Sequence, residues 1–178
     1  MWYQKFDTFI RGLSFTRRKV YHCVYFKLIS DRVIYLVLYV DDMLLVGNDK
    51  EIIQDLKTQL SSKFDTKDLG AANYILGMEI KRDRGKRKLW LNQRKYVETI
   101  LQRFNMQNSK LVKVPIPIGV RLSVEQCPKT QEEEEDMSPF PYASVVGSLM
   151  YSMVCTRLDI AHAMGVLRRF MSNPGKEH

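Results

Sequence analysis

Two adjacent carboxylates, Asp41 and Asp42, interrupt the longest apolar run of the chain, residues 33–46. On either side of the pair the sequence is rich in β-branched, aromatic and aliphatic residues, which predicts two strands. Because apolar side chains fill successive positions, we expect both strands to be buried on both faces of a sheet. An uncompensated charge between such strands would be costly, so the junction should be a tight turn that carries both carboxylates to the end of the sheet.

The acid pair has two interpretations. Carboxylates aimed outward from the end of a sheet are the oxygen ligands that hard cations such as Mg²⁺ prefer, with substrate phosphates completing the octahedron. Alternatively, the pair only marks a solvent-exposed hairpin turn, in which Asp is a favoured residue. The local sequence favours the metal interpretation, because Tyr39 and Val40 run directly up to the pair. Neither Gly nor Asn is present there to form an ordinary two-residue turn.

The first 124 residues alternate between helical and extended patterns, which predicts an α+β fold with an antiparallel sheet and helices on one face. Apolar residues from Trp2 to Ile10 recur at helical spacing without a capping residue before them, so the chain is expected to open inside an amphipathic helix. Asn48 and Glu51 resemble a capping box for a second helix that ends near Phe64. The other expected elements are strands at 20–28, 33–40, 43–47, 74–81 and 88–91, a helix capped by Asn92, and an extended segment at 114–117.

A compositional break separates the C-terminal part of the chain. Residues 125–141 contain three prolines and the acidic run 132–136, whose like charges and lack of apolar side chains predict an exposed linker. Two helices follow, the second starting at Thr156 with Asp159 as its capping partner, and together they predict a helical hairpin. The predicted domain organisation is therefore 1–73, 74–124, 125–141 and 142–178.

Composition and charge narrow the class of protein. The chain has 178 residues, of which 45% are apolar and 27% charged, and this excludes collagen, coiled coil and wholesale disorder. Its net charge of +8 favours a polyanionic partner such as nucleic acid, although a basic surplus also serves solubility alone. Residues 81–88 hold six basic side chains and one acidic one, enough to bind several phosphates; a solvated turn is the alternative.

Neither the cysteines nor the apolar segments indicate a secreted or membrane protein. Cys23, Cys127 and Cys155 are widely separated, which argues against a disulfide framework and against a zinc site. No apolar run is long enough to span a bilayer, and the N-terminal residues lack the zones of a secretory signal. An intracellular location is therefore expected.

Residues 39–42 read Tyr-Val-Asp-Asp and resemble the Y-x-D-D motif of reverse transcriptases, and residues 38–44 resemble its form in copia-type long-terminal-repeat retrotransposons. The resemblance continues in order along nearly the whole chain. It implies a partial polymerase palm over 1–73, a primer-grip-like hairpin and thumb over 74–124, and a helical hairpin over 142–178 that leads toward a ribonuclease H domain. The segments that carry it are 1–6, 64–70, 74–80, 93–104, 141–150, 156–161 and 172–178.

This resemblance implies an RNA-directed DNA polymerase that transfers nucleotides with two metal ions, Mg²⁺ or Mn²⁺, held by Asp41 and Asp42 as catalytic metal ligands. The implied partners of the intact parent are an RNA or DNA template-primer and a deoxynucleoside triphosphate (dNTP). Tyr39 would pack on the primer-terminal base pair, unless it is a core aromatic. Gly77 would let a primer phosphate approach the backbone, unless it only twists a hairpin. The implied template-primer contacts are Tyr39, Val40, Gly77, Met78, Lys81, Arg82, Arg84, Lys86, Arg87 and Lys88.

The same resemblance places the fingers, and the strand with the first catalytic aspartate, before Met1. Two carboxylates without that further ligand would hold a metal loosely, so the isolated chain is expected not to polymerise. Two alternatives remain open: a non-catalytic remnant that binds nucleic acid through the basic hairpin, and an inert product of a decayed element that self-associates through an exposed sheet edge. For an element of this family, the expected location is the cytoplasm, within a virus-like particle, or the nucleus.

Overall fold

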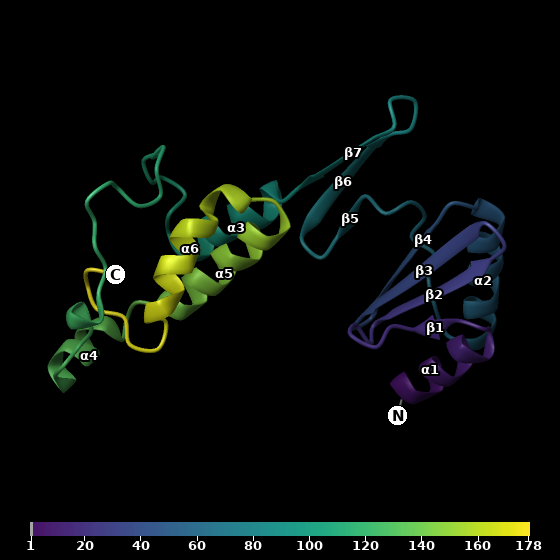
Figure 1. Cartoon of the computed structure of the whole chain (residues 1–178), viewed down its shortest axis with the longest axis horizontal. Helices are drawn as coiled ribbons and strands as arrows, with labels where there is room; N and C mark the ends of the chain where they lie inside the picture. The colour runs from purple at the N-terminus through teal and green to yellow at the C-terminus, as the bar shows by residue number, and fades with distance from the viewer. Residues whose placement is uncertain (1) are drawn as a thin grey trace. The chain divides into compact units, whose positions relative to one another are not determined.

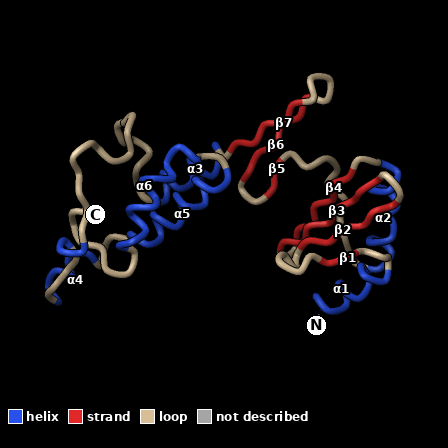
Figure 2. The backbone as a smooth tube through the Cα atoms, viewed as in Figure 1, coloured by secondary structure: helices blue, strands red, loops and turns tan. Residues whose placement is uncertain are grey.

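The structure is a computed structural model that describes residues 2–178 and divides into two compact units, one up to Ala72 and one from Asn73 to His178 (Figure 1). Both units combine helices with an antiparallel sheet, so the predicted α+β class is confirmed. Figure 2 shows the strands in two separate groups, β1 to β4 and β5 to β7. Met1, the first residue of the predicted opening helix, lies outside the described residues. None of the helices between residues 2 and 178 is long and apolar enough to cross a membrane.

The first unit is a four-stranded antiparallel sheet in the order β1-β2-β3-β4, with two helices on one face (Figure 1). Hydrophobic residues of both helices and of the sheet form one core. The helical periodicity of the opening residues and the strand patterns on both sides of Asp41 and Asp42 therefore predicted the elements correctly. Their bounds are α1 (Trp2–Gly12), β1 (Thr16–Arg17), β2 (Val24–Ile29), β3 (Arg32–Tyr39), β4 (Asp42–Gly47) and α2 (Lys50–Lys63).

Burial of this sheet is one-sided, which differs from the expectation that its strands are buried on both faces. Along β3, Ile34, Leu36 and Leu38 are buried, whereas the residues between them are only half-buried. The physical reason is that α1 and α2 pack on the same face, where Phe6 and Leu56 meet the buried residues of β3. The opposite face is left open to solvent within this unit.

Two local predictions in the first unit are wrong by a few residues. The predicted cap of α2, Asn48, does not cap it; Asp49 does, accepting hydrogen bonds from the backbone N–H groups of Glu51 and Ile52. Asn48 instead ties the β2–β3 turn to the end of β4, since its side chain accepts from Val33 N–H and donates to a neighbouring backbone carbonyl. The strand expected from residue 20 begins only at Val24, because residues 19–23 form a turn.

The second unit consists of a three-stranded sheet followed by helices. Helix α3 packs on α5, where the rings of Tyr96 and Tyr151 lie 5.0 Å apart edge to face, and α5 and α6 form the predicted helical hairpin. The bounds are β5 (Tyr74–Ile75), β6 (Met78–Asp83), β7 (Lys88–Asn92), α3 (Arg94–Arg103), η1 (Val124–Gln126), α4 (Gln131–Met137), α5 (Tyr142–Cys155), η2 (Leu158–Ile160), α6 (Ala161–Leu167) and η3 (Arg168–Phe170).

The strand expected at 74–81 is broken into β5 and β6 by a two-residue turn, Leu76–Gly77, with Ile75 paired to Met78. Both turn residues have positive φ angles, 50° and 72°, as a type I′ hairpin turn requires. The interpretation of Gly77 as a residue inside a strand is therefore wrong.

The acidic run 132–136, predicted to be an exposed linker, is exposed but forms part of helix α4. The Thr130 side chain accepts a hydrogen bond from Glu133 N–H and caps α4, and glutamates in a first helical turn are favoured by the helix dipole. Asp159 does not cap the last helix; it pairs with Arg157 at 2.7 Å, and α6 begins after a 3-10 turn.

Candidate metal and nucleic-acid site

The acid pair lies at the tip of the β3–β4 hairpin. Tyr39 pairs with Asp42, so Val40 and Asp41 form a two-residue turn. Val40 has a φ of 51°, in the left-handed region that glycine and asparagine favour and that a β-branched residue rarely adopts. Holding valine there costs on the order of 1–3 kcal/mol, and strain of this kind is concentrated at functional sites. This tip therefore differs from an ordinary hairpin turn, as the absence of Gly and Asn suggested.

The side chains at the tip face solvent. Asp41 and Asp42 are exposed, and so are Tyr39 (55%) and Val40 (72%), which excludes the alternative that Tyr39 is a core aromatic. Tyr39 and its cross-strand partner Asp42 lie on the same face of the sheet, opposite to the face on which Leu38 is buried. Within residues 2–178, neither carboxylate of the pair forms an ion pair or a side-chain hydrogen bond.

The donor chemistry of the pair fits part of a site for a divalent cation. Carboxylate oxygens are the ligands that Mg²⁺ and Mn²⁺ prefer. Over the part of the chain that the structure describes, however, no three side chains of His, Cys, Asp or Glu are grouped to hold a metal ion. The two aspartates can therefore supply only some of the ligands of an octahedral ion.

Two other carboxylates of the first unit are already engaged by other groups. Asp7 accepts hydrogen bonds from Tyr25 Oη at 2.9 Å and from Arg17 at 3.3 Å. Asp49 caps α2 and pairs with Arg32 at 2.8 Å; the backbone N–H of Ile52, and then Arg32, hold the pKa of Asp49 below its usual value. Neither residue is free to complete the ligand set of the acid pair.

The basic residues predicted to contact the template-primer lie on the β6–β7 hairpin of the second unit, where Asp83 closes the turn by accepting a hydrogen bond from Lys86 N–H. Next to them on β7, the exposed Trp90 adds aromatic surface. Between residues 2 and 178, none of these cations forms an ion pair. All are exposed: Lys81, Arg82, Arg84, Lys86, Arg87 and Lys88.

Gly77 and Met78 lie at the opposite end of this hairpin, against the helices. A Cβ at Gly77 would approach the Tyr96 ring of α3 to 3.4 Å, and Tyr151 of α5 donates a hydrogen bond to the Leu76 carbonyl. The close approach at Gly77 is thus made by an aromatic ring of the chain itself. Contact of Gly77 and Met78 with a primer stays a prediction.

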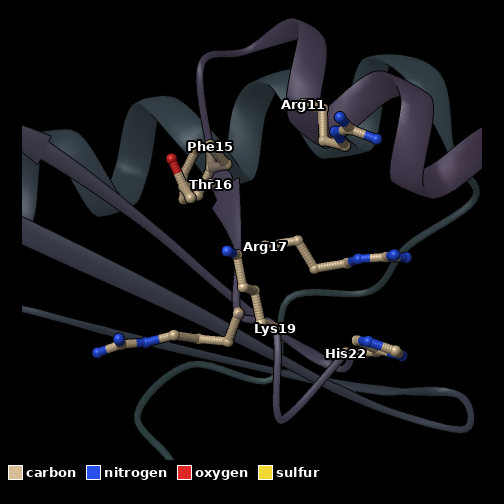
Figure 3. Close-up of a pocket in the computed structure, with 7 residues that line it drawn as sticks. Arg11, Phe15, Thr16, Arg17, Lys19 and His22 are labelled. Atoms are coloured by element: carbon tan, nitrogen blue, oxygen red, sulfur yellow. The ribbon is translucent and has the colours of Figure 1, made fainter.

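A basic groove at the edge of the first sheet was not predicted from the sequence. A cavity of about 400 Å³ lies beside β1, and basic side chains dominate its lining (Figure 3). The signal in the sequence was the short run Arg17-Arg18-Lys19, which has fewer charges than the hairpin at 81–88 and stands out only when Arg11 and His22 are brought beside it.

Comparison with known proteins supports the resemblance. A sequence profile described as reverse transcriptase (RNA-dependent DNA polymerase) matches residues 1–118. A retrovirus-related Pol polyprotein from the transposon TNT 1-94 of Nicotiana tabacum is 56% identical over 178 residues, which is 99% of this chain and 13% of the polyprotein. The corresponding polyprotein from transposon RE1 of Arabidopsis thaliana is 32% identical over 99% of this chain and 12% of its own length.

A shorter relative, an uncharacterized mitochondrial protein of Arabidopsis thaliana, is 37% identical over 140 residues, or 79% of this chain and 54% of that protein. The chain thus spans about an eighth of the two polyproteins and about half of the shorter relative. No solved structure matches the chain significantly. On the extent of the profile match and the identity to the transposon polyproteins, this chain belongs to the reverse transcriptase (RNA-dependent DNA polymerase) family.

Proposed function

We propose that this chain is the distal palm and thumb of an RNA-directed DNA polymerase and supplies, through Asp41 and Asp42, part of its metal-binding centre. The observation that carries the proposal is the acid pair itself: two exposed carboxylates at the tip of a hairpin whose turn holds a valine at positive φ. An isolated pair of like charges at such a position is relieved by a cation. Nucleic-acid template binding and use of a divalent metal are general properties of the family to which the chain belongs.

In this proposal each exposed group has a role in nucleotidyl transfer. Bound Mg²⁺ or Mn²⁺ would activate the primer 3′-hydroxyl and stabilise the leaving pyrophosphate of the dNTP. Asp41 and Asp42 would supply carboxylate oxygens to the metal centre, and Tyr39 and Val40 would pack against the primer-terminal base pair. The six cations of the β6–β7 hairpin would bind phosphates of the template-primer.

We further propose that the chain does not polymerise by itself, because its acid pair needs a further carboxylate from outside residues 1–178. The test is a primer-extension assay with purified chain, Mg²⁺ or Mn²⁺, a template-primer and dNTPs. No incorporation above background is expected. Incorporation that disappears in Asp41→Asn would overturn this part of the proposal.

Metal binding by the pair is measured separately, by titrating the chain with Mn²⁺ and following the free ion by electron paramagnetic resonance. Wild-type chain should bind Mn²⁺ weakly, and Asp41→Asn combined with Asp42→Asn should abolish that binding. The matched control is Asp65→Asn, an exposed aspartate in the same unit, which should bind as the wild type does. If the double variant keeps wild-type binding, the assignment of the metal site is wrong.

A second candidate function is nucleic-acid binding without chemistry, and the exposed, unpaired cations of the β6–β7 hairpin favour it. Under this alternative, Lys86→Ala with Arg87→Ala weakens duplex binding, while Asp41→Asn changes only metal affinity. The polymerase proposal is distinguished by complementation: the wild-type chain, and not Asp41→Asn, should restore primer extension when combined with the upstream part of a related polymerase.

Two further properties are proposed from the family and from the sheet. The location is intracellular, either cytoplasmic within a virus-like particle or nuclear, and fractionation of cells that express the chain tests this.

Strand β4 is an edge of the first sheet, and its unpaired backbone groups can pair with another chain. Size-exclusion chromatography with light scattering should therefore show self-association, and a monomer that melts cooperatively would count against it.

A further inference from the structure

We propose that the basic groove beside β1 binds the phosphodiester backbone of a nucleic acid, at the same end of the sheet as the acid pair. The groove has a volume of about 400 Å³, and its basic lining consists of Arg11, Arg17, Arg18, Lys19 and His22. Figure 3 shows Arg11, Arg17 and His22 projecting on the same side of the strand, with Arg17 between the other two. This site lies in the first unit and shares no residue with the hairpin at 81–88.

The charges of the groove are only partly compensated. Asp7 pairs with Arg17 at 3.3 Å and with Arg11 at 3.6 Å, so one carboxylate serves two guanidinium groups. Arg18 and Lys19 are exposed and, among residues 2–178, neither has a carboxylate partner. The lining therefore carries four formal positive charges against one carboxylate: Arg17 lies on the helix side with Asp7, and Arg18 lies over Phe26 on the uncovered side. This surplus favours an anion with several charged groups.

Two of the arginines are held in place before any ligand binds. A guanidinium nitrogen of Arg17 donates to Tyr3 Oη at 3.1 Å as well as to Asp7. The Arg18 guanidinium lies 4.9 Å from the centre of the Phe26 ring, a cation–π contact. Guanidinium groups that are already ordered lose less entropy when they bind a phosphate than free side chains do.

The strand register places the groove beside the acid pair. Arg18 N–H donates to the Val24 carbonyl at 2.9 Å, and Leu38 N–H donates to the Cys23 carbonyl at 2.9 Å. Residues 18–23 therefore lie at the end of the sheet where the Val40–Asp41 turn lies. With a strand spacing of about 4.8 Å, β1 lies about 10 to 14 Å from the β3–β4 hairpin. This distance equals the rise of about three or four nucleotide steps along the axis of a duplex.

The open face of the sheet connects the two sites. Phe26 on β2 pairs with Tyr35 on β3, and their rings lie 6.3 Å apart. Since side chains alternate along a strand, Tyr35 and Tyr39 lie on the same face as Phe26, the face that the helices leave uncovered. A nucleic acid whose end lies at the acid pair and whose backbone crosses this face reaches Arg18 and Lys19.

The inference rests on the proposed function for the choice of nucleic acid as the anion. The shared chemistry is the phosphate group, which can come from a polynucleotide or from a free triphosphate. The test therefore uses the full chain with two probes: a fluorescein-labelled DNA duplex with a 5′ overhang, followed by anisotropy, and inorganic triphosphate as an unlabelled competitor.

The decisive variant is Arg18→Ala with Lys19→Ala, and its control is Lys50→Ala with Lys63→Ala, which removes the same charge from exposed positions on α2. The duplex affinity is measured between about 50 and 200 mM salt, and the slope of log K against log salt gives the number of phosphate contacts. The groove variant should reduce the magnitude of that slope by about 1 to 2, at roughly one per cation removed. The control should change it by much less, and thermal melting should show that both variants are folded.

The outcomes separate this inference from the proposed function. Equal slope changes in the groove variant and the control would overturn the inference, because the effect would then be one of net charge alone. Displacement of a bound duplex by stoichiometric triphosphate would assign the groove to free triphosphates instead, and would overturn the backbone assignment. If Lys86→Ala with Arg87→Ala weakens duplex binding while the groove variant does not, the groove inference fails and the hairpin role stands. The reverse result supports the groove and removes the hairpin from the proposed function.

Discussion

Tyr25 Oη donates a hydrogen bond of 2.9 Å to Asp7 Oδ1 and so joins the buried face of β2 to α1. The Tyr25 side chain is fully buried, and its ring meets that of Phe6 edge to face at 6.0 Å. Arg17 reaches the same carboxylate from β1. One buried hydroxyl and one half-buried carboxylate therefore connect the core of the first unit to the basic groove at its edge.

Tyr25→Phe should destabilise the first unit by about 1 to 2 kcal/mol, because it removes a hydrogen bond to a charged acceptor and leaves the ring packing intact. The measurement is urea unfolding followed by circular dichroism. Tyr39→Phe removes a hydroxyl from an exposed ring and should leave the unfolding midpoint unchanged. Equal effects of the two changes would show that the Tyr25 hydrogen bond contributes nothing.

Stability should also fall at alkaline pH. Burial, together with hydrogen bonds to Tyr3 and Asp7, raises the pKa of Tyr25 above its ordinary value of about 10. The folded chain then keeps a proton that the unfolded chain loses, so the free energy of unfolding decreases as pH rises above about 10. In Tyr25→Phe this decrease should be shallower, which urea midpoints at pH 9 and above would show.

Val40→Gly should stabilise the β3–β4 hairpin by about 0.5 to 1 kcal/mol, because glycine adopts a positive φ without the strain that valine carries there. Its matched control is Val46→Gly, at a partly exposed position of β4. There the same substitution should destabilise by about 1 kcal/mol. Thermal unfolding distinguishes the two signs, and a destabilised Val40→Gly would show that the valine is not strained.

Gly77→Ala should destabilise the second unit by about 1 to 2 kcal/mol, since an alanine there must adopt a φ of 72° and press its Cβ against Tyr96 at 3.4 Å. Gly119 has a φ of 93°, and a Cβ added there would meet no atom within 4 Å, so Gly119→Ala carries the backbone cost alone. The difference between the two urea midpoints measures the contact with Tyr96. No difference would mean that the ring moves aside freely.

Asp49 should make stability depend on pH in the acid range. Its pKa is lowered by the hydrogen bond from Ile52 N–H and by Arg32, so its contribution is present above the ordinary aspartate pKa of about 4 and is lost as pH falls below it. Asp49→Asn should therefore flatten the loss of stability between about pH 5 and pH 2. Urea midpoints of the wild type and of Asp49→Asn across this pH range measure the difference, and equal slopes would contradict the role of Asp49.

Sequence periodicity predicted the elements of the first unit because each has one strong apolar face, such as Phe6 and Ile10 on α1. Periodicity could not distinguish Asn48 from Asp49 as the cap of α2, since both are good capping residues. In the structure the Asn48 side chain binds Val33 N–H of β3, and Asp49 caps the helix. The turn at Leu76–Gly77 was missed because leucine rarely adopts a positive φ; in the structure the turn also contacts α3 and α5.

Only those parts of the candidate site whose residues are consecutive in the sequence could be predicted. Asp41 and Asp42 follow from four consecutive residues, and the basic hairpin from eight. The basic groove was missed because Arg11 joins Arg18 and Lys19 only after α1 folds back against β1. Charges that are brought together by a sheet edge leave no periodic signal in the sequence.

The two-residue turn of the β3–β4 hairpin fixes which face of the sheet each residue on either side of it occupies. Tyr39 and Asp42 pair directly and lie on one face of the sheet because the turn between them contains only Val40 and Asp41. A deletion or insertion of a single residue there would invert the parity of β4, turning Met43 and Leu45 outward and the carboxylate of Asp42 toward the core. Side-chain exchanges at the tip leave this alternation intact, whereas a change in its length would place a carboxylate against the core of the first unit.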